Sequence, residues 1–179
     1  MSGCLLPHHG IIGASGNGGG GGNFVHIVEH DYEYMELAGR YWIKENVQEL
    51  SVAHSGYNNP LYPQAVWYKW SEAQSMCPQG WRIPNYNDFV ALANLVGGIN
   101  VCSIPLRTTS GWNSNQGTDI LGIGLAPTGY RSQDAKYMFA CWLSDKYYFY
   151  VRCDANKGSK SPYPYGDNDF FAVRYVKDV

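Results

Sequence analysis

The side chains best suited to chemistry lie late in the chain, between Tyr137 and Phe171, where aromatic residues are dense. The rings are interleaved with Ser, Asp, Asn, Lys and Gly, whereas a buried strand favours Val, Ile and Leu. Tyr offers a large rigid contact face and a hydroxyl at low entropic cost, and small polar residues adapt to a partner. This composition indicates non-covalent recognition. Tyrosines half-buried across the strands of an ordinary β-domain are the alternative explanation.

We predict that the aromatic and polar side chains of this stretch form a ligand-binding surface. The predicted contact residues are Tyr137, Asp145, Tyr147, Tyr148, Tyr150, Asp154, Asn156, Tyr163, Tyr165, Asp167 and Asn168. Side chains alternate along a strand, so about half of the strand tyrosines are expected to point inward. Replacing Tyr148, Tyr150, Tyr163 and Tyr165 together with Ala is expected to abolish binding and to leave the melting curve nearly unchanged.

No residue pattern predicts catalysis or a bound cofactor. The five cysteines are Cys4, Cys77, Cys102, Cys141 and Cys153. They show neither CxxC nor Cys/His spacing. We interpret most of them as small buried thiols in a protein folded in a reducing compartment. A disulfide between two of them stays open. Neither a nucleophile elbow nor an acid–base pair is found. We therefore expect no enzymatic activity, no cofactor and no metal.

Two histidines raise the question of a metal site. His26 and His30 flank Val28 on one face of a strand predicted over Phe24–His30. No carboxylate or cysteine completes a ligand set at useful spacing, so we interpret both histidines as facing solvent.

Composition bounds the class of protein. A chain of 179 residues with 45% apolar residues can bury one core, and its formal net charge of −2 creates no global field that attracts nucleic acid. No apolar run is long enough to cross a bilayer. Residues 1–22, which end in GNGGGGG, are interpreted as a Gly-rich arm or linker and residues 23–179 as the domain. The first residues lack the basic segment and the apolar run of a signal peptide.

Periodicity predicts a mixture of strands and helices. Strands are expected over Phe24–His30 and Leu37–Ile43, and helices over Trp67–Met76 and Tyr86–Val96. Asn85 is a favourable N-cap for the second helix, and Asp88 stands three residues on, where a capping box places an acid. From Asn100 onward, Gly, Pro, Ser, Thr and Asn divide short apolar pieces, which indicates loops and short strands.

Several separate motifs occur in an order that is familiar. They are YWIKEN at Tyr41–Asn46, AQSMCPQGWRIP at Ala73–Pro84, TSGW at Thr109–Trp112, GTDILGIGLAPTGYR at Gly117–Arg131 and FAVRYVKD at Phe171–Asp178. In this order they resemble the Fibrobacter succinogenes major paralogous domain of the C-type-lectin-like superfamily, over roughly Tyr41 to Val179. The chain departs from that pattern at Arg82, Ile123 and Tyr175.

The resemblance implies an α+β, C-type-lectin-like fold, with two helices packed on short twisted antiparallel sheets and paired N- and C-terminal strands. The superfamily includes receptor-binding proteins of phages and bacteria whose surfaces a retroelement diversifies toward Tyr, Asp, Asn and Ser. By that resemblance we expect a tail-tip or adhesin protein, on a virion or a bacterial cell surface, that binds a bacterial surface protein or glycan receptor. A homo-oligomer, such as a trimer, is expected, without nucleic acid and without membrane insertion.

Two alternatives stay open. The aromatic residues could pack against a neighbouring domain, in a structural or surface-assembly domain of an exported bacterial protein. Asp167, Asn168 and Asp169 carry the short oxygen ligands that Ca²⁺ takes, which would suit a calcium-dependent lectin. The loop and strand motifs of a lectin calcium site are missing, so a polar loop on the binding surface is the simpler interpretation of these three residues.

Overall fold

The computed structural model describes residues 22–52, 58–59, 62–129 and 135–179. The strands are β1 (Asn23–Ile27), β2 (His30–Leu37), β3 (Arg40–Ile43), β4 (Asn58–Asn59), β5 (Tyr62–Val66), β6 (Met138–Trp142), β7 (Tyr148–Arg152), β8 (Gly158–Lys160) and β9 (Val176–Asp178). The helices are α1 (Trp70–Ser75), α2 (Tyr86–Asn94) and α3 (Ser103–Leu106). The α+β class is thus confirmed. Among the described residues, none of the helices has the length and apolar character needed to cross a bilayer.

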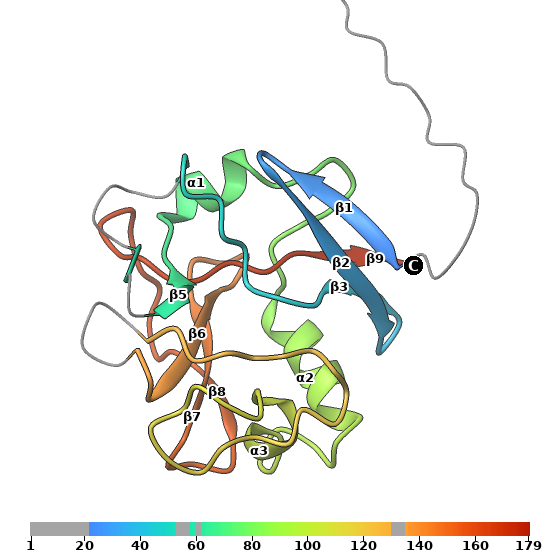
Figure 1. Ribbon diagram of the computed structural model, residues 1–179, viewed down its shortest axis with the longest axis vertical. Helices are drawn as coiled ribbons and strands as arrows, with labels where there is room; N and C mark the ends of the chain where they lie inside the picture. The colour runs from blue at the N-terminus through green and yellow to red at the C-terminus, as the bar shows by residue number, and fades with distance from the viewer. Residues whose placement is uncertain (1–21, 53–57, 60–61, 130–134) are drawn as a thin grey trace, which may run out of the picture.

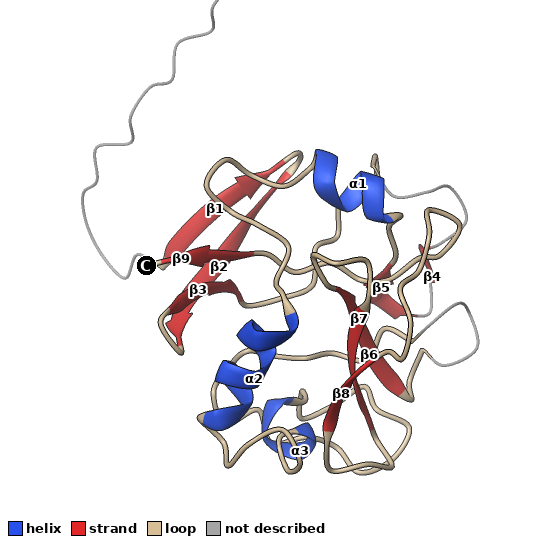
Figure 2. Cartoon of the chain, turned by 180° about the vertical axis from the view of Figure 1, so that it is seen from behind, coloured by secondary structure: helices blue, strands red, loops and turns tan. Residues whose placement is uncertain are grey.

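The strands form antiparallel sheets at two sides of the molecule (Figures 1 and 2). One sheet has the order β1-β2-β3-β9, another the order β6-β7-β8, and β4 pairs with β5. The last strand, β9, pairs with β3, with Trp42 opposite Val176. The two ends of the described chain therefore meet in one sheet.

Tight turns correct the two strand predictions. The strand expected over Phe24–His30 ends at Ile27, because the chain reverses at Val28 and pairs His30 with Ile27. The strand expected over Leu37–Ile43 is interrupted by Ala38 and Gly39, whose φ angles are 53° and 70°. Positive φ at both central residues suits the twist of a two-residue hairpin. His26 and His30 consequently lie on different strands and not on one face of a single strand.

The helix predictions are confirmed with changed boundaries. In α2 the Asn85 side chain accepts the Asp88 N–H at 3.1 Å, and the Asp88 carboxylate accepts the Asn85 N–H at 2.7 Å. This is the predicted capping box. Helix α1 begins later than predicted, since Tyr68 is extended and exchanges backbone hydrogen bonds of 3.0 and 3.2 Å with Phe171. The single turn α3 was not predicted.

The four described cysteines are free thiols, as predicted for the part of the chain that the structure covers. Cys102, Cys141 and Cys153 are buried and Cys77 is half-buried. Burial raises the pKa of the Cys141 thiol to about 12, which keeps it protonated and poorly nucleophilic.

A buried carboxylate joins α2 to the N-terminal sheet. Asp88 is 4% exposed and accepts two hydrogen bonds from Arg82, at 2.5 and 3.0 Å, and one from Arg40 at 3.4 Å. Burial alone would raise the pKa of Asp88, but the hydrogen bonds from Arg82 and from the Asn85 N–H outweigh it, so the pKa lies below its usual range.

Replacing Asp88 with Asn is expected to lower the free energy of unfolding at pH 7 by about 1–3 kcal/mol, because two half-buried arginines lose their buried anionic partner. Asp88 stabilises the fold above the pKa of an unfolded Asp, about 3.9, and this contribution is lost as pH falls through the lower folded pKa. The difference in unfolding free energy between the parent protein and Asp88→Asn should therefore become smaller below about pH 4. Urea unfolding at a series of pH values measures this difference.

The matched control is Asp178→Asn, which removes the exposed acid from the same pair of arginines. This substitution should lower the unfolding free energy by less than about 1 kcal/mol, because solvent screens an exposed ion pair. An equal cost for both variants would contradict the assignment of Asp88 as the buried anchor.

Candidate functional site

Strand β7 separates an interior face from an outer face. Phe149 and Val151 are buried, whereas Tyr148, Tyr150 and Arg152 are half-buried on the opposite face. The Phe149 ring stacks on Phe89 of α2, with centroids 4.1 Å apart and planes at 9°. Because side chains alternate along a strand, this contact directs the tyrosines to the opposite face, where they are half-buried against a second hydrophobic cluster that includes Trp142 and Phe171.

A glycine in β8 makes room for that stack. Gly158 pairs with Val151, and a Cβ at this glycine would lie 2.6 Å from the Phe149 ring and 3.0 Å from the Cys102 sulfur. No real Cβ tolerates the first separation, so a larger residue would displace Phe149. The small residue thereby holds the register that presents the tyrosines.

Four tyrosines of the predicted site form what we call the aromatic surface: Tyr148, Tyr150, Tyr163 and Tyr165. Tyr148 stacks on Phe171 at 4.3 Å, and its ring centroid lies 5.6 Å from Tyr150 and 5.2 Å from Tyr165. Tyr165 also meets Phe171 edge-on at 5.4 Å. Tyr163, in the same loop as Tyr165, is 63% exposed. Packing on Phe171 holds the Tyr148 and Tyr165 rings in place, and Tyr150 packs on Tyr148, while part of each ring faces solvent.

Other predicted contact residues form two smaller groups. Asp145 and Tyr147 lie in the β6–β7 turn, and Lys160 of β8 contacts both. The Lys160 ammonium lies 3.7 Å from the Tyr147 ring centroid and donates a 2.6 Å hydrogen bond to Asp145. This group packs at the edge of the interior face, because Tyr147 contacts the core cluster that contains Phe149.

The third group lies at the far end of β7. Tyr137 donates to Asp154, and Arg152 donates to both, at 2.5 Å to the Tyr137 hydroxyl and 2.8 Å to the carboxylate. The hydrogen bond to Asp154 raises the pKa of the Tyr137 hydroxyl, and the bonds from Tyr137 and Arg152 lower the pKa of Asp154. The three side chains form a pre-arranged polar cluster at the surface.

None of the eleven predicted contact residues is fully buried. Asp145, Asp154, Asn156, Tyr163, Asp167 and Asn168 are exposed, and Tyr137, Tyr147, Tyr148, Tyr150 and Tyr165 are half-buried. The prediction that removing four of the tyrosines leaves stability unchanged needs correction for Tyr148 and Tyr165, because both rings pack on Phe171.

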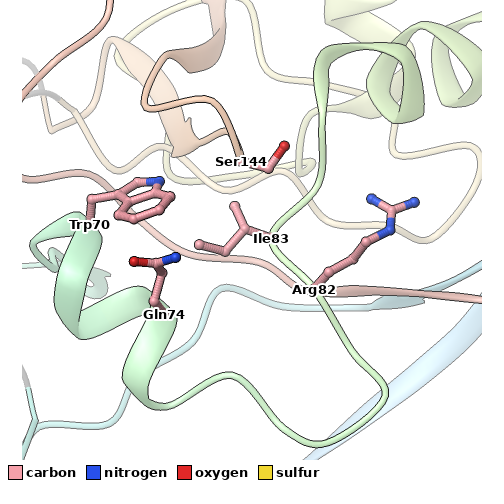
Figure 3. Close-up of a pocket in the computed structure, with 5 residues that line it drawn as sticks. All are labelled: Trp70, Gln74, Arg82, Ile83 and Ser144. Carbon is pink, nitrogen blue, oxygen red and sulfur yellow. The ribbon is translucent and has the colours of Figure 1, made fainter.

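A cavity beside the aromatic surface contains residues that were not predicted as contacts. It has a volume of about 270 Å³ and is lined by Trp70, Gln74, Arg82, Ile83 and Ser144 (Figure 3). Figure 3 shows Trp70 and Gln74 projecting from α1 toward Ile83, with Ser144 on the other side. Trp70 and Gln74 stand four residues apart within the helix predicted over Trp67–Met76, a spacing that puts both on one side of a helix and was the available signal.

Hydrogen bonds fix this cavity to the aromatic surface. The Trp70 indole donates to the Leu143 carbonyl at 3.2 Å, and the Lys146 ammonium lies 4.8 Å from the Trp70 ring centroid. The Tyr165 N–H in turn donates to the Lys146 carbonyl at 2.7 Å. The Ser71 N–H donates to Asp167 at 3.3 Å. Helix α1 and the loop that carries Tyr165 and Asp167 therefore form one continuous face.

Ala substitutions should separate framework rings from freely exposed ones. Tyr148→Ala and Tyr165→Ala are each expected to cost about 1–3 kcal/mol in unfolding free energy, since half-buried stacked rings are lost. Tyr163→Ala, at a mostly exposed position, should stay within about 0.5 kcal/mol. Urea denaturation of the three variants checks this; a loss at Tyr163 as large as at Tyr148 would show that the loop packs differently.

The chain was compared with known protein families, curated proteins and solved structures. A search of curated proteins and a search of solved structures gave no match. The family model of the Fibrobacter succinogenes major domain matches residues 35–177, from β2 to within β9, which includes both cavity and aromatic surface. The chain therefore belongs to the Fibrobacter succinogenes major domain family.

Proposed function

We propose that this protein is a non-enzymatic binding domain with a C-type-lectin-like fold, which attaches through its aromatic surface to a bacterial surface receptor. The observation that carries the proposal is the two-sided strand β7, whose interior residues pack on α2 while Tyr148 and Tyr150 lie half-exposed on the opposite face, at the edge of a second hydrophobic cluster. The pairing of β9 with β3 near the start of the matched segment is consistent with the proposed fold.

The physical chemistry of the surface suits association. Rings already held by stacking on Phe171 lose little conformational freedom when a partner covers them. The hydroxyls of Tyr150 and Tyr163 have no hydrogen-bond partner among the described residues, so they can bond to a ligand without breaking an existing contact. Exposed Asp167 and Asn168 add adaptable polar groups next to the rings.

The proposed partner is a protein or glycan receptor on a bacterial surface, and the proposed setting is a phage tail tip or an adhesin, on a virion or a cell surface. Each contact of this kind is modest, so homo-oligomerisation, for example as a trimer, would raise the overall avidity. Diversification by a retroelement is part of the proposal, since the composition of the surface matches that of such variable proteins. A reverse-transcriptase gene beside a near-identical template repeat would test this part.

Binding of the purified protein to envelope fractions from a panel of bacteria tests the function. Tyr163→Ala combined with Asn168→Ala is expected to lower affinity tenfold or more, because exposed aromatic residues carry a large share of binding energy. Both positions are exposed, so the variant should keep the parent melting temperature.

The matched control is Phe24→Ala in β1, where the ring is 58% exposed on the other sheet. It should bind like the parent protein, and added chelator should not change the affinity if calcium plays no part. Equal losses for Phe24→Ala and the double variant would contradict the aromatic surface as the contact region, and loss with chelator would favour the calcium-dependent lectin.

A further inference from the structure

We propose that Glu29, His30 and Glu49 bind one divalent transition-metal ion, independently of the aromatic surface. One ligand atom from each residue lies within 4.8 Å of the other two. Glu29 and His30 belong to the turn between β1 and β2 and the start of β2, and Glu49 follows β3 in the chain. The sequence spacing between His30 and Glu49 gave no indication of this cluster, which exists only because the chain returns past the turn.

The carboxylate of Glu49 is the central observation. Its side chain is 0% exposed, and its Oε2 accepts the Glu29 N–H at 2.9 Å and lies 3.1 Å from His30 Nδ1. Its other oxygen, Oε1, is equally buried and has no hydrogen-bond partner. A buried oxygen without a partner costs about 1–3 kcal/mol, and more when it is charged. A cation bound to this carboxylate would remove that cost.

The donors specify the kind of metal. One imidazole nitrogen with two carboxylates suits Zn²⁺ and related ions, whereas Ca²⁺ and Mg²⁺ prefer six or more oxygen ligands. Ligand distances of about 2.0–2.2 Å in a tetrahedral site place neighbouring ligand atoms about 3.3–3.6 Å apart. The observed 3.1 Å between His30 Nδ1 and Glu49 Oε2 is already close to that separation. The exposed Glu29 side chain can rotate to complete the set, and solvent would supply a fourth ligand.

Access and charge favour occupancy. Glu29 and His30 are exposed, so two of the three ligand side chains face solvent, where an ion can first bind. No Lys or Arg of the described residues forms an ion pair with either Glu29 or Glu49, so no cation of the protein competes for the two carboxylates.

The test is isothermal titration of the full chain with ZnCl₂, together with the thermal shift that the ion produces. His30→Gln and Glu29→Gln, both at exposed positions, should fold and should each weaken one saturable Zn²⁺ site tenfold or more, as expected for the loss of a ligand. The Zn²⁺-dependent rise in melting temperature should fall in the same variants.

His26→Gln is the matched control, because His26 pairs with Asp31 on the same hairpin at 2.8 Å but lies outside the three-residue cluster. It should leave the Zn²⁺ affinity unchanged. The proposal is overturned if the parent shows no Zn²⁺ binding that His30→Gln weakens, or if His26→Gln weakens it equally. MgCl₂ should give no comparable shift. Because none of these measurements involves envelope fractions, failure here leaves the proposed attachment function untouched.

Discussion

The stack of Phe149 on Phe89 is the contact on which the presentation of the surface depends. It joins α2 to the central strand of the three-stranded sheet, and its parallel rings leave no room for a shift in register. A slip by one residue would turn Tyr148 and Tyr150 toward the core around Phe89 and move Phe149 and Val151 to the half-exposed face. The core contact thus determines which side chains reach solvent, although it lies on the opposite face of the strand.

A buried arginine gives order to the parts of the fold that have little regular secondary structure. Arg174 is 0% exposed and donates to the carbonyls of Ile43, Ile123 and Gly124 and to the side-chain oxygen of Asn46, at 2.5–3.0 Å. Burial lowers its pKa to about 10, so it remains charged at neutral pH. One side chain therefore ties the end of β3 and a glycine-rich loop to the C-terminal segment, and the planar guanidinium suits such a cluster of acceptors.

Local signals predicted some elements well and others poorly. Helix α2 could be predicted because its N-cap, capping acid and apolar spacing all lie within one short segment. The hairpin at Ala38 could not, since alanine seldom adopts a positive φ and gives no turn signal. Tyr68 is extended through its pairing with Phe171, a long-range contact that overrides the local helical pattern.

The candidate site shows the same division. Composition alone pointed to the tyrosines, and alternation explains why Tyr148 and Tyr150 share a face. The sequence could not show that α1 contributes Trp70 to the same face, or that Glu49 lies beside the β1–β2 turn. Both arrangements depend on tertiary contacts between segments that are distant in the chain.

Hydroxyl-radical footprinting of the native protein, read by mass spectrometry at each tyrosine, tests the central claim most directly. Tyr163 should be oxidised rapidly and Tyr150 at an intermediate rate, whereas Tyr68 and Tyr175, both 0% exposed, should react only after unfolding. Protection of Tyr150 and Tyr163 to the level of Tyr175 would mean that these rings lie inside the molecule, and the outward-facing surface would have to be abandoned.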